Sequence, residues 1–321
     1  MPPAPAVAVG TRGSQLARRQ TALVVDLLRA AWPELRCEVR PIVTEGDRSQ
    51  ESGRPLPEIG GKGLFTEALE HGLRGGELDL AVHSLKDLPT EEAAGVTVGA
   101  VCLREDARDC LVSREGLGLA ALPAGAVVGT SSLRRVAQLR ALRSDLDLRS
   151  IRGNVDTRIR KVQEGEYDAT VLAAAGVRRL ELERFVTEWL EPQAMLPAPG
   201  QGALAVQCRA GDERVLELLA AIDDAVARSA TTAERAFLRE LGGGCAAPVG
   251  AHATMSHDPE GPSNTVSQGD LYVRLEGLVL SLDGARAVRV SGEGAPEEIG
   301  ERLARDALAR GADAVLAEIR G

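Results

Sequence analysis

The thiol of Cys245 has the most distinctive chemical setting in this sequence, because three consecutive glycines precede it. Glycine has no side chain and adopts backbone conformations that other residues avoid, so the segment can present one sulfur atom on a mobile approach. A thiol in such a setting is suited to holding a covalently attached group. A buried cysteine beside a flexible turn is the plainer interpretation, and this segment alone would favour it.

A basic segment elsewhere in the chain favours the first interpretation. Between Arg134 and Lys161 there are nine basic and three acidic residues, in a chain whose net charge is -9. Cations concentrated in an acidic protein indicate a local site for an anion. The sulfur atom and the basic segment together predict a covalently held, polyanionic ligand. The low pI and the aromatic content of 2% disfavour nucleic-acid binding.

Two strand-to-helix turns in this basic segment predict anion sites. The free N–H groups and the positive dipole end of a helix N-terminus favour an anion, and arginine binds carboxylates bidentately. The first turn offers Thr130, Ser131, Ser132, Arg134 and Arg135, and the second offers Arg152, Gly153 and Arg158. For the first turn alone, a serine cap with solvated arginines is an equally good interpretation.

A third turn of this kind lies near the N-terminus and contains Arg12 and Ser14. Ligands of open α/β folds bind at the carboxyl ends of the strands, where all three turns are expected. We therefore expect the three turns to face one cleft between two domains.

Asp87 is the candidate for handling a proton. It ends the run HisSerLeuLysAsp, residues 83–87, after an apolar strand, and its neighbour Lys86 favours the ionised carboxylate. Ser84 and Lys86 would lie beside the same ligand. The alternative is an aspartate that caps the turn before Pro89. His83 is expected to be a packed histidine.

Lys62 lies in a glycine-rich loop at 60–63 that lacks the spacing of a phosphate-binding P-loop. Nucleotide binding is therefore poorly supported. The lysine is a candidate anion contact, although a solvated loop lysine is an equally good interpretation.

Alternating strands and helices must position these groups. Apolar periodicity predicts strands at 6–10, 37–43, 78–83, 96–101, 110–112, 127–129, 148–151 and 170–173, and helices at 14–31, 63–74, 133–142, 157–164 and 176–190. This alternation predicts mainly parallel sheets with helices on both faces. A strand at 203–208 would return to the first domain. Beyond it we expect a helix at 229–240, strands at 249–254, 271–282 and 287–291, and a helix at 296–310.

The predicted fold class is α/β with three domains, the first two doubly wound and the third a small α+β domain. Composition changes near 105–108 and 196–202 predict two hinge crossings. The predicted domains are residues 1–104 plus 202–222, 105–201 and 223–321. The polar loops 46–61 and 256–269 are expected to be functional or mobile.

The five cysteines are scattered, odd in number and without a CxxC pair, so we expect neither a disulfide framework nor a metal site. No stretch is apolar and long enough to span a bilayer, and the N-terminus lacks the features of a signal peptide. A cytoplasmic protein is the expectation.

The motifs together resemble the porphobilinogen deaminase (hydroxymethylbilane synthase) family. Any one of them is weak evidence, but the ordered set, which spans residues 11 to about 250, is highly specific. The matching runs lie at 11–14, 60–65, 83–89, 129–135, 151–155, 199–203 and 243–245.

This resemblance implies a transferase that joins four porphobilinogen molecules head to tail, releasing ammonia and giving hydroxymethylbilane for tetrapyrrole biosynthesis. It implies a dipyrromethane cofactor held by a thioether to Cys245, a monomer, and two domains resembling periplasmic ligand-binding proteins. Asp87 would stabilise positive charge on pyrrole nitrogens and assist proton transfer.

The resemblance also implies two sets of binding residues. The cofactor contacts would be Ser84, Lys86, Asp87, Thr130, Ser131, Ser132, Arg134, Arg135, Arg152 and Gly153. The substrate contacts would be Arg12, Ser14, Lys62, Phe65, Arg152, Arg158, Arg179 and Gln201. The sequence departs from the family at Glu58, where some members have a lysine that Arg54 could replace, and in the longer loop 256–269.

A non-catalytic anion-binding module of the two-domain type is the main alternative, because it would also have hinges and arginines at strand ends. It would need neither Cys245 nor Asp87. The intact mass distinguishes the two, since the transferase should be heavier than its sequence by one dipyrrole unit.

Overall fold

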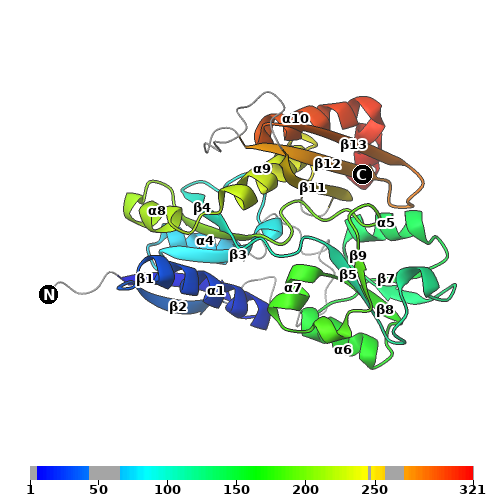
Figure 1. Ribbon diagram of the computed structural model, residues 1–321, viewed down its shortest axis with the longest axis horizontal. Coiled ribbons are helices and arrows are strands. Elements are labelled where there is room, and N and C mark those ends of the chain that lie inside the picture. The colour runs from blue at the N-terminus through cyan, green and yellow to red at the C-terminus, as the bar shows by residue number, and fades with distance from the viewer. Residues whose placement is uncertain (1–5, 43–65, 245–246, 257–270, 321) are drawn as a thin grey trace. The chain divides into compact units, whose positions relative to one another are not determined.

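The computed structural model describes residues 6–42, 66–244, 247–256 and 271–320, which belong to two compact units (Figure 1). The first unit comprises residues 1–104 and 203–224, and the second comprises residues 105–202 and 225–321.

A five-stranded sheet forms the centre of the first unit. Its order is β2 (Arg36–Ile42), β1 (Ala6–Arg12), β3 (Leu80–Ser84), β10 (Leu204–Arg209) and β4 (Val96–Cys102). β1 runs parallel to β2 and β3, whereas β10 is antiparallel to both of its neighbours. Helices α1 (Gln15–Ala31) and α8 (Glu213–Ala220) pack on one face, and α4 (Glu67–Arg74) packs on the other.

The alternation of side chains along β1 explains these two faces. Val7 and Val9 point into the core below α1, while Gly10 lies under α4. A Cβ atom at Gly10 would come within 2.5 Å of Leu78 and 2.8 Å of Leu69, so only glycine fits there. The helix that follows begins at Ser14, whose Oγ accepts a hydrogen bond from the Ala17 amide at 3.2 Å.

The second unit contains a sheet with the same pattern of strand directions. Its order is β7 (Asp147–Arg149), β6 (Val127–Gly129), β8 (Ala169–Ala173), β5 (Asp109–Ser113) and β9 (Glu188–Leu190). β6 is parallel to β7 and β8, and β5 is antiparallel to β8 and β9. Helix α5 (Leu133–Leu142) covers one face, and α6 (Val155–Gln163) and α7 (Ala174–Arg179) cover the other.

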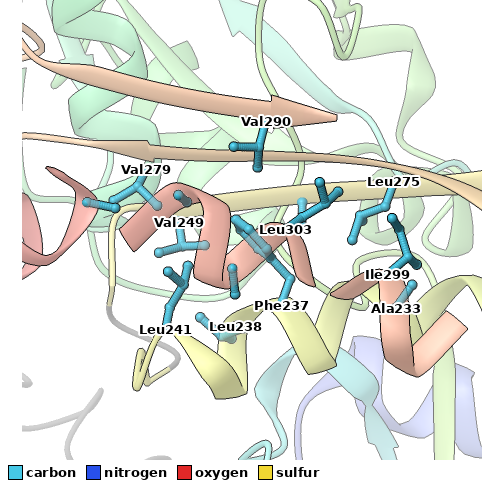
Figure 2. Close-up of a cluster of buried hydrophobic side chains, with 14 of the residues drawn as sticks. Ala233, Phe237, Leu238, Leu241, Val249, Leu275, Val279, Val290, Ile299 and Leu303 are labelled. Atoms are coloured by element: carbon cyan, nitrogen blue, oxygen red, sulfur yellow. The ribbon is translucent and has the colours of Figure 1, made fainter. Parts of the chain in front are cut away.

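A three-stranded antiparallel sheet completes the second unit. It consists of β11 (Val249–Ser256), β12 (Tyr272–Leu280) and β13 (Ala287–Gly294), with helices α9 (Ala225–Glu240), α10 (Pro296–Ala307) and α11 (Asp313–Arg320). Figure 2 shows the side chains of α9 and α10 converging with those of the strands around Phe237. A Cβ atom at Gly277 would come within 2.5 Å of the Phe237 ring, so this glycine makes room for the ring.

Helix α5 packs against the β12–β13 hairpin of the same unit. Arg140 Nη1 donates to the Leu282 carbonyl at 2.7 Å, and Ala137 packs with Leu278 and Leu280. The N-terminal turn of α5 carries the predicted anion site, so this packing fixes the helix that presents it.

The predicted fold class is confirmed: two mainly parallel sheets have helices on both faces, and a small α+β part follows. The predicted strand at 203–208 is confirmed as β10, which joins the first sheet. The division into three domains stays a prediction. Loop 46–61 lies outside the described residues, as does all of loop 256–269 except Ser256.

The helix predicted at 176–190 is wrong. The helix α7 ends at Arg179, Glu181 has a positive φ of 58°, and Glu188–Leu190 forms β9. Hydrogen bonding along the free edge of β5 outweighs helical periodicity in this segment. The helix predicted at 296–310 ends at Ala307, and the chain kinks at Gly311 before α11. Neither α8 nor α11 was predicted.

Candidate functional site

In the first unit, the predicted polar residues lie at the carboxyl ends of β1 and β3. These strands are parallel neighbours, so their ends meet at one edge of the sheet. Arg12 ends β1, Ser14 caps α1, and Ser84 ends β3. Lys86 and Asp87 follow in a short 3-10 turn, Leu85–Asp87.

The side chain of Ser84 is held by a residue that sequence analysis missed. Gln20 is buried on α1, and its Nε2 donates to Ser84 Oγ at 3.0 Å. Beside it, Thr21 Oγ1 donates to Thr11 Oγ1 at 2.7 Å. In the sequence, two adjacent polar residues on the apolar face of a predicted helix could have indicated these contacts. These contacts fix the start of α1 against the strand ends.

Asp87 is exposed, and its turn is held by buried side chains and backbone hydrogen bonds. Leu85 and Leu88 are buried, the Leu85 amide donates to the Ala203 carbonyl at 3.0 Å, and the Leu88 amide donates to the Leu85 carbonyl at 3.1 Å. The framework therefore holds the backbone of the turn while the carboxylate of Asp87 faces solvent.

His83 is buried between the strand core and this polar edge, with an exposed fraction of 6%. Burial, together with the nearby charge of Arg12, lowers the pKa of His83 to about 4. The imidazole is therefore neutral at pH 7. The side chain of Gln207 on the adjacent strand opposes part of this lowering of the pKa.

We expect His83 to make stability depend on pH. An ordinary histidine has a pKa near 6.5, so the unfolded chain takes up a proton there, whereas the folded protein resists protonation down to about pH 4. Above pH 6.5 this group does not lower the free energy of unfolding. As the pH falls from 6.5 toward 4, the free energy of unfolding decreases by up to about 3 kcal/mol. Urea denaturation of the wild type and His83→Gln between pH 4 and 7 measures it. Equal pH dependence in both proteins would contradict this assignment.

In the second unit, the two predicted anion turns are joined through one serine. They follow β6 and β7, whose last residues, Gly129 and Arg149, pair directly. Ser131 Oγ donates to the Ile151 carbonyl at 2.8 Å, accepts from the Ile151 amide at 3.2 Å, and lies 2.8 Å from Ser150 Oγ. The two turns therefore form one continuous surface.

Each of these turns opens a helix without a side-chain cap. Ser132 precedes α5 and Asn154 precedes α6, and neither side chain makes the usual capping hydrogen bond. Thr130 Oγ1 instead accepts from the Ser132 amide at 3.3 Å. The amides of the first helical turns thus have no side-chain cap, which leaves room for an anion beside the neighbouring arginines.

Three guanidinium groups gather at these turns. Arg158 Nε donates to the Gly153 carbonyl at 2.8 Å, and the backbone of Gly153 has a positive φ of 112°. Withdrawal from water and the like charges of Arg135 and Arg152 lower the pKa of Arg158 to about 10. A bound anion would relieve this repulsion.

A buried carboxylate, which sequence analysis did not identify, lies behind this cluster. Asp109 has an exposed fraction of 0%, and it accepts from Arg134 Nη1 and Arg135 Nη2, both at 2.8 Å. Burial would raise the pKa of Asp109, but the two guanidiniums outweigh it and hold that pKa well below its usual range. The available signal was a charged residue at the start of an apolar strand.

Backbone carbonyls hold both arginines as well. Arg134 Nη1 donates to the Leu196 carbonyl at 2.7 Å, and Arg135 Nη1 donates to the Val171 carbonyl at 2.9 Å. The Nε atoms of both side chains are buried without a hydrogen-bond partner. Asp109 compensates for only one of the two guanidinium charges, so this group keeps a net positive charge, which fits a ligand that carries carboxylates.

The remaining predicted residues of this unit make contacts at the segment that precedes β10. Gln201 Nε2 donates to Asp109 Oδ1 at 2.8 Å and to the Ala107 carbonyl at 2.7 Å. Arg179 Nη2 donates to the Gly202 carbonyl at 2.6 Å. Lys62, Phe65 and Cys245 lie outside the described residues, as do Arg54 and Glu58.

Among the described residues, four cysteines are free thiols, and no cluster of acidic, histidine or cysteine side chains could hold a metal ion. Within the same residues, no helix is both apolar and long enough to cross a membrane.

Two family models match the chain. The model described as "Porphobilinogen deaminase, dipyromethane cofactor binding domain" matches residues 7–217, and "Porphobilinogen deaminase, C-terminal domain" matches residues 229–309. A protein named porphobilinogen deaminase from Roseiflexus castenholzii is 50% identical over 96% of this chain and 98% of its own length. One of the same name from Thermus thermophilus is 47% identical over 98% of this chain and 99% of its own length.

Solved structures give a weaker similarity. The periplasmic VFT2 domain of Bordetella pertussis BvgS matches with a TM-score of 0.41 and 16% identity, over 68% of this chain and 87% of that domain.

Proposed function

Because this chain belongs to the porphobilinogen deaminase family, we propose that the residues gathered at the two sheet edges carry out the reaction of that family. The enzyme is a transferase that polymerises four porphobilinogen molecules head to tail with release of ammonia. Its product is hydroxymethylbilane, in tetrapyrrole biosynthesis, and its cofactor is dipyrromethane.

One observation carries the assignment of these residues: the joined turns before α5 and α6 bring the like charges of Arg135, Arg152 and Arg158 together. Each pyrrole of the substrate carries an acetate and a propionate, so every ring adds two negative charges. A protein that holds a lengthening chain of such rings needs a site where cations are in excess before the ligand binds. The joined turns of α5 and α6 supply such a site.

The cofactor, when bound, supplies the pyrrole on which the chain is extended. Its attachment by a thioether to Cys245 follows from the family resemblance. The residues that would contact its carboxylates and ring nitrogens are Ser84, Lys86, Asp87, Thr130, Ser131, Ser132, Arg134, Arg135, Arg152 and Gly153. The position of Arg134 and Arg135 in the first turn of α5, which has no side-chain cap, supports this assignment.

The substrate would be bound by a second set of residues, which are polar or basic except for Phe65. They are Arg12, Ser14, Lys62, Phe65, Arg152, Arg158, Arg179 and Gln201. Arg12 and Ser14 flank the turn from β1 into α1, at the same sheet edge as Asp87, which supports a role close to the reacting groups.

Asp87 is proposed as the catalytic carboxylate. It is exposed on an anchored turn, next to Lys86 in the chain. A carboxylate held there would stabilise positive charge that develops on the substrate's pyrrole nitrogen as ammonia leaves, and it would carry a proton between steps.

Leucine substitutions at the arginine cluster test this function. Arg152→Leu and Arg158→Leu should lower cofactor loading or chain extension by about tenfold or more, because the buried carboxylates of the bound pyrroles would lose their charge-assisted hydrogen bonds. Mass spectrometry of the intact protein after mixing with porphobilinogen reads out both steps.

Arg160→Leu is the matched control. Arg160 lies on the same helix as Arg158, but it is exposed and pairs with Glu164 at 3.0 Å. Its replacement should leave loading and extension unchanged. Normal intermediates in the Arg152 and Arg158 variants would contradict the proposed site.

We further propose a cytoplasmic monomer of three domains that binds neither nucleic acid nor membranes. The free thiols of Cys37, Cys102, Cys110 and Cys208 suit a reducing compartment. The exposed large apolar side chains of the described residues, at Val39, Leu142, Val226 and Met255, are single and scattered, which suits a monomer.

A further inference from the structure

We propose that Asp109 is a positioning residue of the ligand site, and that its buried carboxylate sets the orientation of Arg134, Arg135 and Gln201. This inference rests on the proposed function, which assigns these three side chains to cofactor or substrate. It adds a residue that contacts no ligand itself and acts through the groups that would.

The geometry shows one carboxylate shared among the three side chains. Asp109 Oδ1 accepts from Arg135 Nη2 and Gln201 Nε2, both at 2.8 Å, and Oδ2 accepts from Arg134 Nη1 at 2.8 Å. The three donors come from the start of α5 and from the segment that precedes β10, which are far apart in the sequence. Asp109 therefore links these two segments through hydrogen bonds to a single carboxylate.

The charge balance gives Asp109 a role beyond holding segments together. One carboxylate compensates for one of the two guanidinium charges, so the group of Asp109, Arg134 and Arg135 keeps a net positive charge. Arg135 also lies near enough to Arg158 to lower its pKa. Asp109 thus lets two arginines lie side by side while the cluster stays cationic toward a carboxylate ligand.

Orientation is the second part of the role. An arginine side chain has several rotatable bonds, and its planar donors bind a carboxylate bidentately only when the plane is fixed. Here Asp109 and the Leu196 carbonyl both accept from Nη1 of Arg134, whereas Asp109 accepts from Nη2 of Arg135 and the Val171 carbonyl accepts from its Nη1. A shift of the carboxylate would rotate both planes together.

The test uses two substitutions in the full-length enzyme. Asp109→Glu keeps the charge but lengthens the side chain by one methylene, which moves both guanidiniums. Asp109→Asn keeps the shape but removes the charge. Native mass spectrometry after expression gives the fraction of folded molecules that carry the dipyrrole mass, and thermal unfolding gives stability separately.

We expect the folded Asp109→Glu protein to carry the dipyrrole mass at about a tenth of the wild-type fraction or less, and Asp109→Asn to carry less still. If Asp109→Asn does not fold, the glutamate variant alone decides. Folded Asp109→Glu protein with wild-type loading would overturn the proposal.

Glu234→Gln separates positioning from stability. Glu234 is a fully buried carboxylate of the same unit that accepts from the amides of Gly200 and Ala253, at 2.7 and 2.8 Å. Its variant should lose stability, while its folded molecules stay fully loaded. Loss of loading in Glu234→Gln equal to that in Asp109→Glu would show a general effect of destabilisation and would overturn the proposal.

Arg135→Leu separates this inference from the proposed function. Normal loading of Arg135→Leu would show that the arginine does not serve the ligand, and both proposals would then fail. Loss of loading in Arg135→Leu together with normal loading in Asp109→Glu would leave the proposed function standing and remove only the role of Asp109.

Discussion

Replacement of Cys245 by serine is expected to yield a folded protein at its bare sequence mass, without measurable turnover of porphobilinogen. A serine hydroxyl is a far weaker nucleophile than a thiolate, so the thioether to the cofactor would not form. Intact mass and circular dichroism of the purified variant measure loading and folding independently. The wild type should be heavier than its sequence by one dipyrrole unit.

The other cysteines provide the controls for this prediction. Burial raises the pKa of Cys110 to about 12 and that of Cys208 to about 11, so both thiols stay protonated and unreactive. Cys37→Ser, at a half-buried position of the first unit, should keep the full mass increment and full activity. Retention of the increment in Cys245→Ser, or its loss in Cys37→Ser, would show that another thiol holds the cofactor.

Replacement of Asp87 by alanine is expected to lower turnover by about 10²–10⁴-fold, the usual range for loss of a positioned acid–base group. The side chain is exposed and the turn is held by its backbone and by Leu85 and Leu88, so stability should change by no more than about 0.5 kcal/mol. Release of ammonia from porphobilinogen measures turnover, and thermal unfolding measures stability.

Two further variants sharpen the interpretation of Asp87. Asp87→Glu keeps the charge but displaces it, and it should recover only a small part of the activity. Asp26→Ala removes an exposed carboxylate from α1 of the same unit and should change neither quantity. Near-normal ammonia release by Asp87→Ala would refute the catalytic role.

One local design recurs in both units. Three strands, β1, β6 and β7, each end in a turn that opens a helix, and each turn carries an arginine near the helix start. The turns after β6 and β7 are joined by Ser131, so the second unit presents a continuous cationic surface rather than two separate sites. This arrangement is suited to a ligand whose charge grows by repetition.

The sequence by itself was sufficient for the alternating fold and for the positions of the strand-end turns. Apolar periodicity and glycine-rich turns are local properties, and they predicted α1, α5, β6 and β10 closely. They failed at 176–190, because pairing of β9 with the edge of β5 is a long-range interaction that helical periodicity does not report. The ordered motifs also determined the family, since each is a contiguous run of residues.

Only the tertiary structure revealed what surrounds those motifs. Asp109, Gln20 and the joining contact of Ser131 depend on segments that are far apart in the chain, so no local pattern points to them. It also showed that Arg134 and Arg135 are not solvated cations but members of a buried ion-pair group, with Arg152 and Arg158 completing the charge excess. The physical reason is that burial and charge pairing are set by neighbours in space, whereas a sequence records only neighbours along the chain.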